Sequence, residues 1–266
     1  MFDSGVGGLT VLHECLVSLP EEDYVYLGDT AWFPYGTKDP EQLRKRIRSI
    51  ASLLLGDAKL LVIACNTATS VGTDVAREVA AEHGVEVVPV VEPQAEIAAA
   101  ITDSARVGVL ATPNTVKSGA YRQALEEQGR ALEVTEVEAP DLAPFIQDGS
   151  PFDQGVVEMA RSYCAPLQRA EVDTLILGCT HYPLVAPMLQ RILGRDVRLV
   201  SGGHAVAAAV QRTLERRDLA RASDGEGSYR FLCTGDVDSF RDLGTRFLQM
   251  PLGEVEQIAI SADNYP

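Results

Sequence analysis

Short apolar runs alternate along the chain with longer segments in which apolar residues recur at helical spacing. Each run is followed by a turn that contains Gly, Asn or Thr, and the helical segment comes next. This alternation predicts parallel α/β architecture, because a helix then connects each strand to the next. We expect strands at 24–27, 60–64, 85–91, 106–110, 132–136, 174–177, 198–200 and 229–233. We expect helices at 9–18, 40–55, 70–82, 93–101, 119–127, 155–168, 184–192, 205–215 and 239–247.

Two of these units resemble copies of each other. In 59–67 and again in 173–181, an apolar strand runs into a small residue, a cysteine and a pair of side chains that form hydrogen bonds. The cysteines are Cys65 and Cys179. Parallel strands present functional side chains at their carboxyl ends, where ligands bind in open α/β folds. Each half of the chain therefore offers one thiol, and two halves that face each other across a cleft would place both thiols on one ligand.

Breaks in the pattern predict where these halves divide. One break falls at 92–93 and the other at 201–203. We expect the second half to be inserted between the start and the end of the first. The predicted domains are therefore residues 1–92 plus 205–266, and residues 93–204.

Composition and charge narrow the class of function. The 266 residues include 23 Lys+Arg and 38 Asp+Glu, which gives a net charge of −15, and 46% are hydrophobic. This excess of negative charge repels phosphate backbones, so we expect no nucleic-acid partner. No run approaches the roughly 20 apolar residues that span a bilayer, and the first basic residue, Lys38, comes too late for a secretory signal. We therefore expect no membrane association and a cytoplasmic location.

The cysteines indicate chemistry and not cross-linking. They number five, they are widely scattered, and they form no C-x-x-C pair, so a disulfide framework is not expected. Cys65 and Cys179 each precede a helix, whose N-terminus would lower the pKa of the thiol from its free value of about 8.5. His181 adjoins Cys179 and could hold, donate or accept its proton. The remaining ligands of a zinc site are not found at suitable spacing, so we expect no metal.

A glycine-rich turn at 3–10 leads into the first helix. Thr10 stands where the dinucleotide pattern G-x-G-x-x-G needs its last glycine, so that interpretation fails. The backbone amides of the turn suit a small anion such as a carboxylate. Asp3 is either a helix cap or a group that binds an ammonium or tunes a thiol. The aromatic loop at 27–38 either covers a hydrophobic edge or acts as a lid.

Four motifs together resemble the glutamate racemase family of the aspartate/glutamate racemase superfamily. They are FDSGVGGLTV at 2–11, PYG at 34–36, ACNTA at 64–68 and GCTHYP at 178–183, and the match runs nearly end to end. The resemblance implies an α/β fold of two pseudo-symmetric domains, each a mostly parallel sheet flanked by helices, with the active site at their interface. It also implies no cofactor and a homodimer. The Thr-His-Tyr-Pro sequence around His181 favours glutamate over aspartate or hydantoin substrates.

The resemblance further assigns roles to the positions that match. Cys65 and Cys179 would be the two catalytic acid/bases, with Asp3 assisting the first and His181 assisting the second. The implied substrate contacts are Ser4, Tyr35, Gly36, Asn66, Thr67 and Thr180.

The chain departs from the family pattern in two places. Family members carry several residues before the Asp-Ser-Gly turn, and these form the first strand, whereas this chain begins Met1-Phe2. We therefore expect that strand to be missing. Gln147 stands where many members have an acidic residue, so no auxiliary carboxylate is expected there.

A pair of opposed thiols suits the inversion of a carbon centre. A proton removed from one face must be replaced on the other, and two bases on opposite sides achieve this without rotation of the intermediate. The predicted function is cofactor-independent 1,1-proton transfer between L-glutamate and D-glutamate, which supplies D-glutamate for peptidoglycan synthesis. The alternatives are a racemase or isomerase of another small carboxylate, and a catalytically silent protein that only binds its ligand.

Overall fold

The computed structural model describes residues 1–56, 58–148, 153–222 and 225–260. Its strands are β1 (Phe2–Asp3), β2 (Tyr24–Gly28), β3 (Leu60–Ile63), β4 (Glu86–Pro89), β5 (Arg106–Ala111), β6 (Glu133–Glu138), β7 (Thr174–Gly178), β8 (Arg198–Val200), β9 (Tyr229–Cys233) and β10 (Val255–Gln257). Its α-helices are α1 (Leu9–Ser18), α2 (Pro40–Leu54), α3 (Asn66–Glu82), α4 (Val91–Ile101), α5 (Pro113–Ser118), α6 (Ala120–Glu126), α7 (Leu142–Asp148), α8 (Gln154–Arg169), α9 (Ala186–Leu193), α10 (Gly202–Arg216) and α11 (Val237–Leu248). Three short 3₁₀ helices are η1 (Thr30–Trp32), η2 (Tyr35–Thr37) and η3 (Tyr182–Val185).

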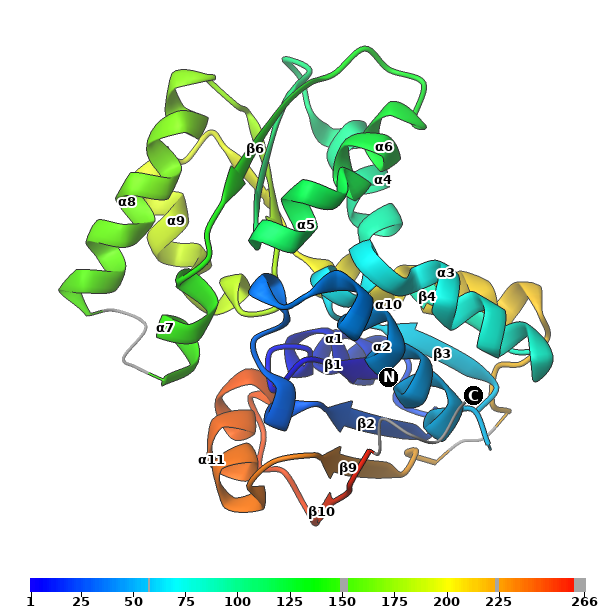
Figure 1. Cartoon of the computed structure of the whole chain (residues 1–266). Coiled ribbons are helices and arrows are strands. Elements are labelled where there is room, and N and C mark those ends of the chain that lie inside the picture. The colour runs from blue at the N-terminus through cyan, green and yellow to red at the C-terminus, as the bar shows by residue number, and fades with distance from the viewer. Residues whose placement is uncertain (57, 149–152, 223–224, 261–266) are drawn as a thin grey trace.

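The strands form two sheets in separate halves of the molecule (Figure 1). The six-stranded sheet has the order β10-β9-β2-β1-β3-β4, and the four-stranded sheet has the order β6-β5-β7-β8. Neighbouring strands run parallel in both sheets, and helices flank each sheet. The predicted α/β fold class with two parallel sheets is therefore confirmed.

Most of the expected elements have counterparts within a few residues. The sequence pattern misses β1, β10, α5 and α7, and it starts α3 four residues too late, since the helix begins at Asn66. The expected helix at 184–192 is divided into η3 and α9. The domain boundaries at 92–93 and 204–205 stay a prediction, and the last six residues assigned to the first domain lie outside the described residues.

The first strand is present, so the expectation that it is missing is wrong. Phe2 is fully buried and pairs with Leu27 of β2 and Ile63 of β3. The Ala64 amide donates to the Phe2 carbonyl at 3.0 Å, and the Leu27 amide donates to the Met1 carbonyl at 3.0 Å. Two residues suffice because a strand on each side satisfies their backbone groups. This strand carries Asp3 to the carboxyl end of the sheet.

Helix α4 connects the two halves near the site. It begins directly after β4 of the first sheet and packs against α6, α10 and β7. The larger core cluster is continuous between the halves, since it includes Leu9 and Val62 together with Val109 and Leu177. A second cluster lies under α2 and α3 and includes Ile47. No described helix has the length and apolar character needed to cross a bilayer.

Candidate active site

Cys65 and Cys179 line one cavity between the two sheets. Cys65 lies two residues beyond β3, and Cys179 directly follows β7, so each thiol stands at the carboxyl end of its own sheet. Both side chains are buried. The structure therefore brings together two thiols that are 114 residues apart in the chain (179 − 65).

The other residues singled out from the sequence gather around these thiols. Those that line the same cavity are Ser4, Tyr35, Gly36, Asn66, Thr67, Thr180 and His181. Asp3 lies behind the lining and contacts it through Thr180, whose hydroxyl donates to Asp3 Oδ1 at 3.3 Å. Each predicted site residue thus belongs to one cluster, although this placement does not test its role.

The Cys65 thiol receives backbone amides from two directions. Its Sγ accepts from the Ala68 amide of α3 at 3.4 Å, and the Ser4 amide also bonds to it. Both bonds favour the thiolate, as expected at a helix N-terminus. Burial and the nearby Asp3 carboxylate act in the opposite direction, and together they raise the pKa of Cys65 well above its usual range.

Burial dominates at the second thiol as well. It raises the pKa of Cys179 to about 12, although the His181 amide and the Thr180 hydroxyl both donate to the sulfur and oppose the rise. The backbone amides therefore act on the pKa in the expected direction, but the net pKa of each thiol is raised and not lowered as expected. Removing water from a thiolate costs more free energy than a few backbone amides restore. Both cysteines are neutral thiols at pH 7 in this conformation.

His181 lies against Cys179 in a wholly buried position. Its Nδ1 is 3.9 Å from Cys179 Sγ, and its Nε2 is 3.0 Å from Gln147 Oε1 of α7. The imidazole packs against the rings of Phe33 and Phe247, with centroid separations of 5.2 and 5.1 Å. Burial lowers the pKa of His181 to about 3, so the ring is neutral at pH 7.

Asp3 is a fully buried acidic residue that contacts Cys65 and Thr180. Its Oδ2 accepts from the Gly5 amide at 3.0 Å, and it also bonds to Cys65. It does not cap α1, which has no side-chain cap. Burial raises the pKa of Asp3, and hydrogen bonds from Gly8, Gly5, Thr180 and Cys65 oppose that rise. Asp3 is therefore not the plain helix cap that the sequence left open, and its role toward the thiols stays a prediction.

The segment 33–36, which leads into η2, lines the cavity, and we refer to it as the cover. The Tyr35 hydroxyl donates to Asp29 Oδ2 at 2.5 Å, and Tyr35 belongs to the second core cluster while also lining the cavity beside Gly36. Asn114 of α5 donates to the carbonyl oxygens of Tyr35 and Lys38 at 3.0 and 2.8 Å. This cover from the first half is thus attached to a helix of the second half.

Asn66 is the centre of a buried hydrogen-bond network. Its Nδ2 donates to Gln94 Oε1 at 2.9 Å and to the Tyr121 hydroxyl oxygen at 2.6 Å. Gln94 in turn donates to the carbonyl oxygens of Leu177 and Val200 at 3.2 Å each. The network therefore connects α3 of the first half to β7 and β8 of the second.

The cavity is small in this conformation. Its volume is about 20 Å³, which is room for roughly one water molecule and not for a five-carbon diacid. Thr67 Oγ1 lies 2.9 Å from Thr112 Oγ1, so hydroxyl groups of the two halves meet beside the cavity. The structure is thus a closed form, and an amino acid enters only if the cover or the two halves move apart.

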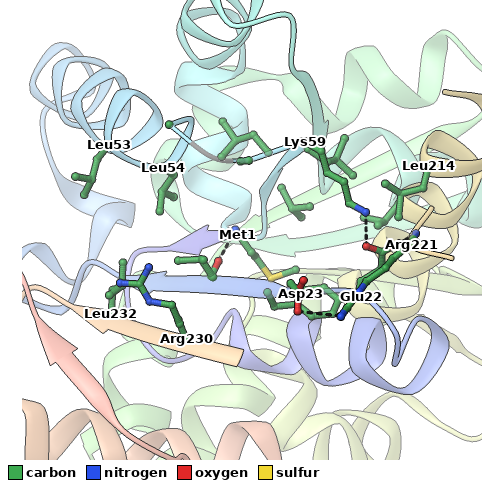
Figure 2. Close-up of a pocket in the computed structure, with 18 of the residues that line it drawn as sticks. Met1, Glu22, Asp23, Leu53, Leu54, Lys59, Leu214, Arg221, Arg230 and Leu232 are labelled. Atoms are coloured by element: carbon green, nitrogen blue, oxygen red, sulfur yellow. Dashed lines mark hydrogen bonds and ion pairs between the residues drawn. The ribbon is translucent and has the colours of Figure 1, made fainter. Parts of the chain in front are cut away.

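A larger cavity lies at the opposite end of the first sheet (Figure 2). It measures about 670 Å³ and lies where β2 and β3 extend past the start of the short β1. The Met1 amine borders it and donates to the Val25 carbonyl at 2.8 Å, and burial lowers the pKa of that amine to about 5. None of the predicted site residues lines this cavity. Within the described ranges, no group of three or more His, Cys, Asp or Glu is placed to hold a metal ion.

Several residues of the site escaped the sequence reasoning. Gln94 is wholly buried in an Ala-rich helix, and a lone amide on such a helix face is a signal that could have been used. Gln147 was noted only as a departure from a family pattern, whereas the structure places it on His181. Nothing in the sequence pointed to Asn114 and Thr115 as site residues, since a polar residue in a short helix is usually exposed.

Comparison with known proteins identifies the relatives of this chain. The family model described as Asp/Glu/Hydantoin racemase matches residues 10–210. A glutamate racemase of Geobacter metallireducens is 40% identical over 264 residues, which cover 99% of this chain and 97% of that protein. A glutamate racemase of Mycobacterium tuberculosis is 42% identical over 260 residues, which cover 97% of this chain and 94% of that protein.

Solved structures agree with these matches over nearly the whole chain. The crystal structure of glutamate racemase isoform RacE1 from Bacillus anthracis has a TM-score of 0.92 at 32% identity, covering 97% of this chain and 96% of that one. The glutamate racemase of Francisella tularensis, solved in complex with D-glutamate, has a TM-score of 0.91 at 31% identity, covering 99% and 97%.

Proposed function

The chain belongs to the Asp/Glu/hydantoin racemase family and is an amino-acid racemase, and we propose that it interconverts L-glutamate and D-glutamate without a cofactor. The observation that carries this proposal is the presence of Cys65 and Cys179, one from each sheet, on the same cavity. The names of the relatives and the D-glutamate bound to one of them support the choice of substrate.

The reaction needs one thiolate and one thiol. The thiolate of one cysteine takes the α-proton, and the electron pair of the broken C–H bond is left on the α-carbon and its carboxylate. The thiol of the other cysteine then gives its proton to the opposite face of that carbon, which inverts the centre. The two cysteines exchange protonation states in each turnover, so no other proton carrier is consumed.

High thiol pKa values suit this chemistry once substrate is bound. The α-proton of an amino acid is far less acidic than a free thiol, so a thiolate that burial makes more basic is better matched to it. The substrate ammonium supplies a positive charge beside both thiols, and it favours formation of the thiolate in the closed complex. Asp3 assists Cys65, and His181 assists Cys179. Ser4, Tyr35, Gly36, Asn66, Thr67 and Thr180 hold the substrate.

Closure excludes water from the carbanionic intermediate. The cover is attached to α5 through Asn114, so the closed form is held by contacts across the two halves. Without water, the backbone amide dipoles interact more strongly with the developing negative charge and stabilise it better. Substrate therefore enters an open form, and chemistry takes place once the two halves have closed around it.

Substitution of each cysteine tests the proposal. In Cys65→Ser and Cys179→Ser, racemisation of either glutamate enantiomer, followed by circular dichroism, is expected to fall by at least about a hundredfold. The matched control is Cys164→Ala, because Cys164 is buried in α8 away from the cavity and its loss should leave the rate near that of the parent. Near-normal racemisation in either serine variant would reject the two-thiol mechanism.

Solvent deuterium separates this function from its alternatives. During racemisation in heavy water, the α-carbon of glutamate is expected to acquire deuterium. Incorporation into a different small carboxylate but not into glutamate would favour another substrate of the same family. Glutamate binding without incorporation would indicate a silent binding protein.

The family resemblance also supports a cellular role for the product. We propose that D-glutamate formed by this enzyme enters peptidoglycan synthesis, that the enzyme acts in the cytoplasm, and that it is a homodimer. Depletion of the protein in its host should be relieved by added D-glutamate. Light scattering of the purified chain should give twice the mass of 28.6 kDa.

A further inference from the structure

His181 is held between a sulfur and an amide. On one side, Nδ1 lies 3.9 Å from Cys179 Sγ, and on the other, Nε2 lies 3.0 Å from Gln147 Oε1. Gln147 is itself buried near the end of α7, where Oε1 also lies against the N-terminal turn: a Cβ on Gly5 would be 3.4 Å from it. The amide group therefore has little freedom to turn away from the imidazole.

The chemistry of these atoms determines where the imidazole carries its hydrogen. A carboxamide oxygen is only an acceptor, so the hydrogen in the bond to Gln147 belongs to His181 Nε2. A neutral imidazole has a single N–H, which leaves Nδ1 as a bare lone pair facing Cys179 Sγ. Burial, which lowers the pKa of His181 to about 3, keeps the ring in this neutral state.

We propose that Gln147 is a positioning residue that holds His181 in its Nε2–H tautomer, so that Nδ1 accepts from the Cys179 thiol and favours the thiol over the thiolate. This inference rests on the proposed function for its catalytic meaning. A lone pair at Nδ1 stabilises S–H and offers nothing to S⁻, so the thiolate at this position is a strong base when it forms. An N–H at Nδ1 would donate to S⁻ and weaken that base.

A carboxylate at position 147 would reverse the effect. Glutamate there would place a negative charge on Nε2–H and stabilise the doubly protonated ring, whose Nδ1–H would then donate to Sγ. A carboxamide accepts the same hydrogen bond without the charge. Of the other groups beside the ring, Phe33 and Phe247 are not ionisable, and the Thr180 hydroxyl oxygen lies 3.5 Å from Nδ1 and 3.3 Å from the Asp3 carboxylate.

Two variants of Gln147 separate the hydrogen bond from the charge. Gln147→Met removes the acceptor at similar size, and Gln147→Glu keeps an acceptor and adds a charge. In both, the Cys179 thiolate should become more accessible, so alkylation of Cys179 by iodoacetamide at pH 8 should rise severalfold while that of Cys65 is unchanged. In Gln147→Met, racemisation should fall about tenfold, the loss expected for one buried hydrogen bond. Phe145→Ala, at an exposed residue of the same helix, is the matched control and should change neither rate.

Isotope effects distinguish this proposal from a general loosening of the fold, because loosening would not act on one enantiomer alone. If only the step at Cys179 is slowed, the primary deuterium effect on [2-²H]glutamate should grow for the enantiomer that Cys179 deprotonates and shrink for the other. Equal changes for both enantiomers would overturn the proposal, as would racemisation and Cys179 alkylation in Gln147→Met that match the parent.

Nitrogen NMR of the parent protein tests the tautomer without any variant or any turnover. With ¹⁵N-labelled histidine, His181 should show a protonated Nε2 and an unprotonated Nδ1 at pH 7. A protonated Nδ1 would overturn the inference even in a fully active racemase. The expected tautomer, with faster Cys179 alkylation in Gln147→Met, would uphold it even if the parent failed to racemise glutamate and only the proposed function were lost.

Discussion

Thr180 donates its hydroxyl hydrogen to Asp3 across 3.3 Å, which connects the residue after one cysteine to the carboxylate that bonds to the other. The negative charge of Asp3 acts on both sulfurs, since it raises the pKa of Cys65 and that of Cys179. Thr180 has a single hydroxyl hydrogen, and when it donates that hydrogen to Cys179 Sγ in place of Asp3 it acts on Cys179 in the opposite direction. The Asp3 carboxylate and the Thr180 hydroxyl therefore have opposite effects on the pKa of Cys179.

Asp3→Asn is expected to lower the pKa of both thiols, because it removes a nearby negative charge. At pH 9 both cysteines should be alkylated faster than in the parent, while racemisation falls because the group that assists Cys65 is lost. Thr180→Val should have the opposite effect on Cys179, since it removes a hydrogen bond that favours the thiolate. Site-resolved mass spectrometry of the alkylated protein measures both rates, and a change of the same sign in the two variants would contradict this account.

His181 is expected to make the fold sensitive to acid. Its pKa is about 3 in the folded protein and 6.5 ordinarily. As the pH falls below 6.5, the unfolded chain therefore binds a proton at this position that the native state does not bind. The stability contributed by the neutral ring is complete above pH 6.5 and is lost progressively toward pH 3. Between pH 7.5 and 5 the free energy of unfolding of the parent should fall by about 2 kcal/mol more than that of His181→Gln. Urea unfolding at several pH values measures this, and His204→Gln, at an exposed histidine, should track the parent.

Gly36→Ala is expected to disturb the closed form. A Cβ at Gly36 would lie 2.6 Å from the Thr112 Cβ across the two halves, so the cover must shift or open. Overpacking of this kind costs about 1–3 kcal/mol, and it should also raise the KM for glutamate, because the closed complex is weakened. Thermal unfolding and steady-state kinetics measure the two effects. At Gly155 a Cβ would have no neighbour within 4 Å, so Gly155→Ala should leave both the thermal stability and the KM near those of the parent.

Arg46→Met is expected to destabilise the protein strongly. Arg46 Nη2 lies 2.6 Å from Oδ1 of the fully buried Asp29, which also accepts from Tyr35 beside the cavity. Losing the cation leaves a buried carboxylate without its counter-charge, at a cost of about 3–5 kcal/mol. Arg44→Met breaks a comparable ion pair with Asp74 that is exposed, and it should cost at most about 1 kcal/mol. Urea denaturation compares the two variants, and equal losses would show that burial does not control the effect.

The alternation of apolar runs and helical segments was enough to predict the α/β class, since each apolar run must be buried whichever neighbours it finds. It was also enough to place Cys65 and Cys179 at strand ends, because the strand and the turn that follows are encoded within a few residues. The two-residue β1 was missed for the opposite reason. Phe2 forms a strand only because β2 and β3 lie on both sides of it, and nothing in its own neighbourhood requires an extended backbone.

The sequence by itself thus determined which residues could take part, because burial patterns and turns are local properties of the chain. Only the tertiary structure decided what state those residues adopt. The helix N-terminus after Cys65 argued locally for a low pKa, and the burial of the whole cavity reversed that sign, because desolvation depends on every segment that excludes water. Likewise, Gln147 meets His181 only when α7 packs against η3, so the hydrogen that Nε2 carries was determined by a contact between segments far apart in the chain.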